Sequence, residues 1–206
     1  NFDNFNNLFA SLSMGGENTF SVNSNLEEVD DERFISVVQV QTESGIGTGF
    51  FIKKDHIITN FHVVEYDNEI SVKLYNGKTY SAKAIKKDPR KDLALLKVNT
   101  NTGVPVTFYN DKIRVGTEVE AIGHPEGYDY SITRGIISSV RKEETAVMGD
   151  KILMIQTDAA LNHGNSGGPL YYDEFVVGVN TQGLSKDTTE GLNFAIHLSE
   201  LELFLR

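Results

Sequence analysis

The sequence predicts an all-β protein built as a sandwich or a barrel. From residue 34 onward, short runs rich in β-branched and aromatic residues alternate with Gly, Asn, Asp and Pro. No helical pattern separates these runs, and many short strands without intervening helices are typical of sandwiches and barrels. The chain has 206 residues, which is long enough for one good-sized domain or for two small lobes that share an interface.

The predicted strands fall into two sets, joined by a connector at Thr100–Asp111. In the first set, Asn76-Gly77 supplies a two-residue hairpin turn. After the second set, leucines at helical spacing predict a short terminal helix, packed on the body through Leu198, Leu201 and Leu205. The first set is Phe34–Val40, Ile46–Ile52, His56–Thr59, Ile70–Leu74, Thr79–Ile85 and Leu93–Val98, and the second is Glu118–Ile122, Tyr130–Val140, Ile152–Gln156, Glu174–Asn180 and Leu192–Ile196.

The N-terminal residues differ from the rest of the chain. Residues 1–29 are rich in Asn and Ser and show no strand pattern, which is typical of a tail. Phe2, Phe5 and Phe9, however, fall on one face of a short helix, and such phenylalanines indicate docking onto another surface, such as a neighbouring subunit. We therefore expect a tail or oligomerisation arm over 1–29, a first lobe over 30–105 and a second lobe over 106–206.

Composition excludes several functional classes. The chain has no cysteine, so it has no disulfide framework, thiolate zinc site or cysteine nucleophile. The net charge of −10, without a basic cluster, argues against nucleic-acid binding. No apolar run approaches the roughly 20 residues that span a bilayer. No metal-binding or phosphate-cradling motif is present, so we expect no metal and no cofactor.

The strongest chemical signal is the turn Gly164-Asn165-Ser166-Gly167-Gly168-Pro169. Glycines on both sides of a hydroxyl let the backbone approach a substrate closely. Such a turn can direct the N–H groups of Gly164 and Ser166 at one point, an oxyanion hole formed by Gly164, Asn165 and Ser166. The alternative is an ordinary Gly-rich turn between strands.

A serine nucleophile needs a base and a group that orients the base. His62 directly follows an apolar strand, and Asp92 begins the most apolar strand of the first half. Taken singly, His62 is also compatible with a half-buried structural residue and Asp92 with a common strand-start role. We interpret three further histidines, His124, His163 and His197, as structural or surface residues.

Together these residues resemble the HtrA/Deg branch of the trypsin-like serine proteases, over about residues 30 to 200. The order His62, Asp92, Ser166 is that of the family. The matching motifs are Gly47-Thr48-Gly49-Phe50, Thr59-Asn60-x-His62-Val63-Val64, Asp88-Pro89-Arg90-x-Asp92-Leu93-Ala94-Leu95, Gln156-Thr157-Asp158-Ala159-Ala160, Gly164–Pro169, Gly178-Val179-Asn180-Thr181 and Asn193-Phe194-Ala195-Ile196.

The resemblance implies a chymotrypsin-like fold of two six-stranded antiparallel β-barrels with a short C-terminal helix. It also implies a serine endopeptidase in which Ser166 attacks a peptide carbonyl, His62 takes its proton and Asp92 orients the imidazole. Activity is then expected to rise with pH as the histidine base loses its proton, at about pH 6–7 for ordinary histidines.

Two positions differ from the digestive members of the family, and these differences bear on substrate specificity and on how activity is switched on. Position 165 is Asn rather than Asp, so pairing of this residue with a freed N-terminus is not available as a switch. An Ala instead of an Asp six residues before the nucleophile argues against cleavage after Arg or Lys, and small or medium apolar residues are expected instead. By the resemblance, the pocket is lined by Ala160, Leu161, Thr181, Gln182 and Gly183.

The resemblance also implies partners and a location. The expected substrates are unfolded or misfolded proteins, as in protein quality control, and the expected location is extracytoplasmic, in a periplasm or an organelle lumen. A homotrimer is expected through Phe2, Phe5, Phe9 and Phe20, and this chain carries the protease part without the PDZ domains that usually follow it. Two alternatives stay open: a chaperone-like peptide-binding module with a resting or weak site, and a processing protease with one substrate.

Overall fold

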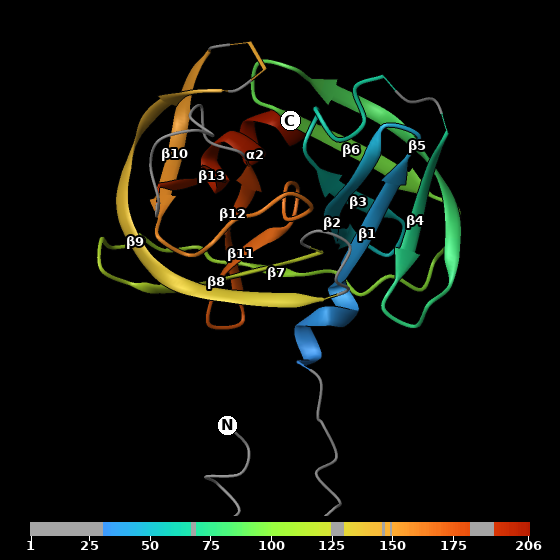
Figure 1. Cartoon of the computed structure of the whole chain (residues 1–206), viewed down its shortest axis with the longest axis horizontal. Helices are drawn as coiled ribbons and strands as arrows, with labels where there is room; N and C mark the ends of the chain where they lie inside the picture. The colour runs from blue at the N-terminus through green and yellow to red at the C-terminus, as the bar shows by residue number, and fades with distance from the viewer. Residues whose placement is uncertain (1–30, 67–68, 125–129, 146, 149, 182–191) are drawn as a thin grey trace, which may run out of the picture. The chain divides into compact units, whose positions relative to one another are not determined.

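The computed structural model describes residues 31–66, 69–124, 130–145, 147–148, 150–181 and 192–206. The strands form two antiparallel barrels, coloured blue to green and green to red in Figure 1, and one helix follows them at the C-terminal end. The predicted all-β, chymotrypsin-like fold is confirmed. The expected lobe boundary at 105/106 stays a prediction, and the expected tail at 1–29 lies outside the described residues.

The first barrel is closed in the order β1-β2-β3-β6-β5-β4. In β4, buried Ile70, Val72 and Leu74 alternate with half-buried positions and face the core, whereas β1, β2 and β3 each contain a continuous buried run. The hairpin turn lies where it was predicted but has three residues rather than two: the Leu74 N–H donates to Lys78 O, the Gly77 N–H donates to Leu74 O, and Gly77 has a φ of +79°. The strands are β1 (Val37–Thr42), β2 (Gly45–Lys53), β3 (His56–Thr59), β4 (Ile70–Leu74), β5 (Thr79–Asp88) and β6 (Leu93–Val98).

The second barrel has the order β11-β8-β9-β10-β13-β12 and is closed by the pairing of β11 with β12. A short strand, β7, adds to β12 in parallel. In Figure 1 the long yellow strand β9 curves around the outside of this barrel. The strands are β7 (Thr107–Phe108), β8 (Glu118–Gly123), β9 (Ser131–Glu144), β10 (Lys151–Thr157), β11 (Pro169–Tyr172), β12 (Phe175–Thr181) and β13 (Asn193–His197).

Two details differ from the sequence prediction. Phe34–Val40 was expected to be one strand, but a 3₁₀ helix, η1 (Glu32–Ser36), occupies its start. The reason is local: the Asp31 side chain accepts from the Arg33 N–H, which stabilises a turn where the apolar pattern alone favours a strand. Strands β7 and β11 were not predicted, because segments of two and four residues show no readable alternation.

The predicted terminal helix is confirmed as α2 (Leu198–Leu205). Its buried face consists of Leu201 and Phe204, whereas Leu205 is exposed, so the expected role of Leu205 in packing was wrong. His197 caps the helix, since its Nδ1 accepts from the Ser199 N–H at 3.1 Å. No helix within the described ranges is long and apolar enough to cross a membrane.

Candidate active site

His62 and Asp92 meet at the end of the first barrel. His62 lies in the turn that follows β3, and Asp92 immediately precedes β6. Because β3 and β6 pair antiparallel, with Thr59 opposite Ala94, these two positions are neighbours. The His62 Nδ1 atom lies 2.9 Å from Asp92 Oδ2, and the His62 main-chain N–H donates to Asp92 Oδ1 at 3.0 Å. The carboxylate therefore orients both the imidazole and the backbone of His62.

Asp92 is held in an unusual conformation. Its φ is +54°, in the left-handed region that costs a non-glycine residue free energy. Its carbonyl accepts from the Phe61 N–H at 3.1 Å and from Asn60 Nδ2 at 3.0 Å. These two hydrogen bonds stabilise the conformation that turns the carboxylate toward His62. Asn60 belongs to the motif before His62, but the sequence alone did not indicate this contact.

Thr181 contributes to the same cluster from the second barrel. Its Oγ1 donates to Asp92 Oδ2 at 2.8 Å, and the residue is buried. Sequence analysis assigned Thr181 to the specificity pocket, which stays a prediction; its hydroxyl supports the carboxylate, which is itself only 1% exposed. A buried carboxylate needs such donors to offset its lost hydration.

Ser166 lies in the predicted tight turn before β11. Gly164 and Gly167 have φ values of +99° and +86°, which favour glycine. A Cβ atom added to Gly167 would lie 2.2 Å from Thr48 O, so this turn requires glycine for space as well as for conformation. The Ser166 carbonyl accepts from the Thr48 N–H at 2.9 Å, which ties the turn to β2 of the first barrel.

Some main-chain N–H groups of this turn donate hydrogen bonds within the protein, and others do not. The Asn165 N–H donates to Asn162 O at 3.1 Å, and the N–H groups of Gly167 and Gly168 also donate to carbonyls. Among the described residues, no acceptor is bonded to the N–H of Gly164 or of Ser166. Of the three residues expected at an oxyanion hole, Gly164 and Ser166 thus keep an available N–H, and Asn165 does not.

A small pocket brings the chemical groups together. It has a volume of about 180 Å³ and includes His62, Ser166 and Gly164 in its lining. The hairpin between β1 and β2 forms one wall, and exposed His163 lies beside it. The pocket therefore brings Ser166, His62 and Gly164 to one small volume.

The residues expected to set specificity lie beyond this pocket. Ala160 is exposed, and its carbonyl accepts from Thr133 Oγ1 at 2.7 Å. Leu161 is half-buried and packs against the core of the second barrel. Gln182 and Gly183 lie outside the described residues.

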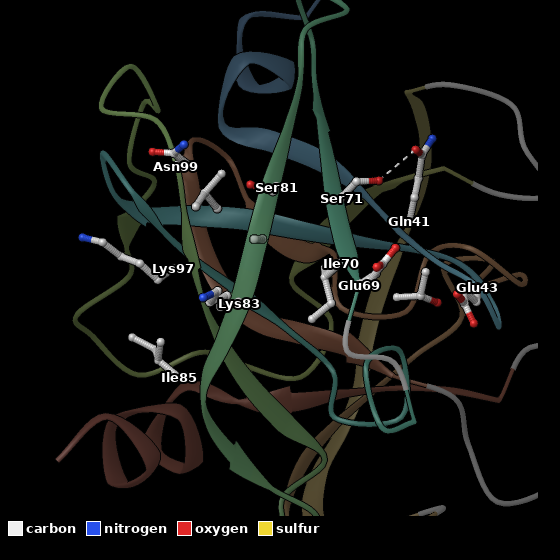
Figure 2. Close-up of a pocket in the computed structure, with 13 residues that line it drawn as sticks. Gln41, Glu43, Glu69, Ile70, Ser71, Ser81, Lys83, Ile85, Lys97 and Asn99 are labelled. Carbon is white, nitrogen blue, oxygen red and sulfur yellow. Dashed lines mark hydrogen bonds between the residues drawn. The ribbon is translucent and has the colours of Figure 1, made fainter.

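A larger hollow lies elsewhere, on β1, β4, β5 and β6 of the first barrel. Figure 2 shows it crossing these strands, with Glu43 and Glu69 toward one end and Lys83 and Lys97 toward the other. Its volume is about 950 Å³, but neither His62 nor Ser166 lines it. Size alone therefore does not identify the reactive site. Within the described part of the chain, no group of His, Asp and Glu side chains is arranged to hold a metal ion.

The two barrels, with a His–Asp pair and a serine turn between them, define the class of trypsin-like peptidases. A family profile described as "Trypsin-like peptidase domain" matches residues 47–179, and the chain belongs to this family.

Its relatives are proteases of the HtrA and DegP type. The chain is 41% identical over 173 residues to "Serine protease Do-like HtrA" of Bacillus subtilis, covering 78% of this chain and 38% of that protein. It is 46% identical over 158 residues to "Probable periplasmic serine endoprotease DegP-like" of Pseudomonas fulva, covering 75% and 33%. The structure resembles that of a serine endoprotease from Yersinia pestis, with a TM-score of 0.72, 30% identity and coverage of 84% and 62%. The chain thus spans well under half the length of these curated relatives.

Proposed function

We propose that this chain is a serine endopeptidase that uses His62, Asp92 and Ser166 as a catalytic triad. One observation carries the proposal: His62, already bonded to buried Asp92, lines the same small pocket as Ser166. The Gly164 N–H beside them is available as an oxyanion donor. The family and its protease relatives support the same function.

The geometry supports an acyl-enzyme mechanism. Ser166 Oγ attacks the carbonyl carbon of the peptide bond, while His62 Nε2 removes the hydroxyl proton. The developing oxyanion accepts hydrogen bonds from the N–H groups of Gly164 and Ser166. His62 then gives the proton to the leaving amine, and water hydrolyses the acyl-enzyme by the same steps in reverse. Asp92 holds the imidazole with Nδ1–H toward the carboxylate throughout.

The proposed substrates are unfolded polypeptides, cleaved after small or medium apolar residues. The position six residues before Ser166 is Ala160, and half-buried Leu161 follows it. Neither side chain offers a charge to pair with Arg or Lys. The names of the relatives include a periplasmic protease, which supports an extracytoplasmic location. The proposed role in protein quality control follows from unfolded polypeptides as the substrates.

The test compares the unaltered protein with Ser166→Ala. We expect the unaltered protein to degrade casein and to be labelled by a fluorophosphonate, and Ser166→Ala to do neither, because the nucleophilic oxygen is gone. Ser44→Ala is a matched control, since Ser44 lines the same pocket from the hairpin and has no assigned chemistry. Mass spectrometry of the casein fragments reads the residue before each cut.

Each other outcome has a defined meaning. Labelling without casein cleavage would favour a processing protease with a narrow substrate range. Absence of labelling in the folded, unaltered protein would contradict the proposal. Fragments that end mainly in Arg or Lys would reject the apolar specificity but leave the triad standing.

A further inference from the structure

Thr48 connects the first barrel to the proposed nucleophile turn through its main-chain N–H and its hydroxyl. It lies on β2 and is fully buried. Its N–H donates to Ser166 O at 2.9 Å, and its Oγ1 donates to Gly164 O at 2.6 Å. Its carbonyl accepts from Thr59 Oγ1 at 2.7 Å. Two of these three bonds therefore end on the turn that carries the nucleophile.

The Thr48 hydroxyl acts on one particular peptide group, the one between Gly164 and Asn165. The carbonyl of this group accepts from Thr48 Oγ1, and its N–H donates to Asn162 O at 3.1 Å. A peptide group is planar, so bonds at both ends prevent its rotation. The two available amides, those of Gly164 and Ser166, flank this group on either side. Rotation of the group would change the Gly164 ψ and the Asn165 φ and so turn these amides relative to each other.

Gly164 makes an external restraint necessary. Its φ of +99° and its lack of a side chain leave its backbone with many accessible conformations. A hydrogen bond from a rigid, buried strand is an effective way to select one of them. Thr48 supplies that bond from the other barrel, without touching the pocket in which the reaction is proposed to occur.

His124 orients the Thr48 hydroxyl. The His124 main-chain N–H donates to Thr48 Oγ1 at 3.2 Å, and the His124 Nδ1 lies 3.2 Å from the same oxygen. The single Thr48 hydroxyl proton is directed to Gly164 O, so the oxygen is an acceptor toward His124. The network therefore assigns the proton of the imidazole to Nδ1. His124 is fully buried, in keeping with the structural role that sequence analysis gave as one alternative, and Thr48 links it to the oxyanion turn.

We infer that Thr48 is a positioning residue for the oxyanion hole, with its hydroxyl oriented by His124. The inference rests on the proposed function, because an oxyanion hole matters only if Ser166 attacks a carbonyl. It predicts that the Thr48 hydroxyl affects turnover rather than substrate binding.

The test removes the hydroxyl in Thr48→Val and restores it in Thr48→Ser. For Thr48→Val we expect kcat on a peptide substrate to fall about 10- to 100-fold with KM nearly unchanged, since misplaced oxyanion donors weaken only transition-state binding. Thr48→Ser is expected to recover most of kcat. Thr48→Cys, with a weak S–H donor, is expected to lie between them, and it keeps the test usable if the valine variant does not fold.

The matched control is Thr59→Val. Thr59 is also fully buried, but its hydroxyl bonds to Thr48 O and not to the nucleophile turn. It should therefore lose stability without the same loss of kcat. An equal loss of kcat in the two valine variants, or no loss in Thr48→Val, would overturn the inference.

Amide hydrogen exchange separates this inference from the proposed function. In Thr48→Val we expect exchange of the Asn165 amide to accelerate at least about tenfold, because its peptide group has lost one of two restraints. The Gly167 amide, bonded to Asn180 O within the second barrel, is the internal reference. If the unaltered protein has no activity, the proposed function fails, and exchange still decides whether Thr48 restrains the turn. Unchanged protection of Asn165 would overturn that restraint.

Discussion

At the scale of single residues, the site depends on Asp92. This residue is buried, has a left-handed backbone conformation and accepts hydrogen bonds from several donors. Its carboxylate accepts from the side chain and the main chain of His62 and from Thr181. Because the residue is only 1% exposed, water does not replace any donor that is lost. The orientation of His62 is therefore a property of this one residue and its immediate partners.

Asp92→Asn tests that dependence. An amide oxygen still accepts one bond, but its NH₂ group cannot accept the Nδ1 proton, so the imidazole is driven to the wrong tautomer. We expect kcat to fall by about 10⁴-fold while the fold is kept. Asp88→Asn is the control, since Asp88 Oδ1 accepts only local backbone bonds from Arg90 and Lys91. Activity of Asp92→Asn within about tenfold of the unaltered protein would contradict the role of Asp92.

At the scale of elements, helix α2 is tied to both barrels by Glu200. Its carboxylate pairs with Lys91, next to Asp92 on the first barrel, and accepts from the Leu153 N–H of β10 at 3.1 Å. Burial raises the pKa of Glu200, but the hydrogen bonds from Lys91 and Leu153, with the positive charges of Lys91 and Lys142, outweigh it and lower the pKa below 4.5. The ionised form is therefore favoured in the folded state.

This lowered pKa sets a pH dependence of stability. A carboxyl with a depressed folded-state pKa stabilises the protein fully above its unfolded value of 4.5, and that stabilisation is lost as the pH falls through the folded-state pKa. We expect Glu200→Gln to lower the free energy of unfolding by about 1–3 kcal/mol at pH 7. The difference from the unaltered protein should shrink below pH 4.5.

Urea unfolding at neutral and acidic pH measures this difference. Glu202→Gln is the matched control on the same helix, because the Glu202 side chain is 66% exposed and pairs only with Arg206 one turn away. A Glu200→Gln effect that is equally large at both pH values would contradict the assignment to the ionised carboxylate.

At the scale of the whole molecule, the proposed machinery is divided between two barrels. The first barrel carries His62, Asp92 and Thr48, and the second carries Ser166 and Thr181. The bonds from Thr48 to the serine turn and from Thr181 to Asp92 cross this division in opposite directions. Neither barrel contains the complete site, so the geometry of the site depends on how the two barrels pack.

We also propose a homotrimer, formed through the aromatic residues of the N-terminal segment. Phe2, Phe5, Phe9 and Phe20 lie outside the described residues, so the prediction stands on the sequence alone. Light scattering at tens of micromolar should give three times the chain mass of 22.9 kDa, and deletion of residues 1–29 should give the mass of a monomer. Replacing Phe2, Phe5 and Phe9 by Ser keeps the length and tests the aromatic contacts. A monomeric mass for the unaltered protein would contradict the proposed homotrimer.

The sequence by itself predicted what depends on local pattern. Short runs rich in β-branched and aromatic residues and bounded by turn residues, such as Ile70–Leu74, identified strands, because such side chains favour extended backbone. The Gly-rich turn at Ser166 was recognisable because a close backbone approach requires glycine. Each of His62, Asp92 and Ser166 was identified from the short sequence motif that surrounds it.

Only the tertiary structure decided which of these residues contact one another. Thr181 and Asp92 are separated by 89 positions, and Thr48 and Gly164 by 116. No local pattern encodes such pairs, because they depend on the closure of each barrel and on the packing between barrels. For the same reason, sequence analysis did not indicate that Thr181 contacts Asp92 or that His124 contacts Thr48. The structure shows the Thr181 hydroxyl bonded to Asp92, and the His124 imidazole linked through Thr48 to Gly164.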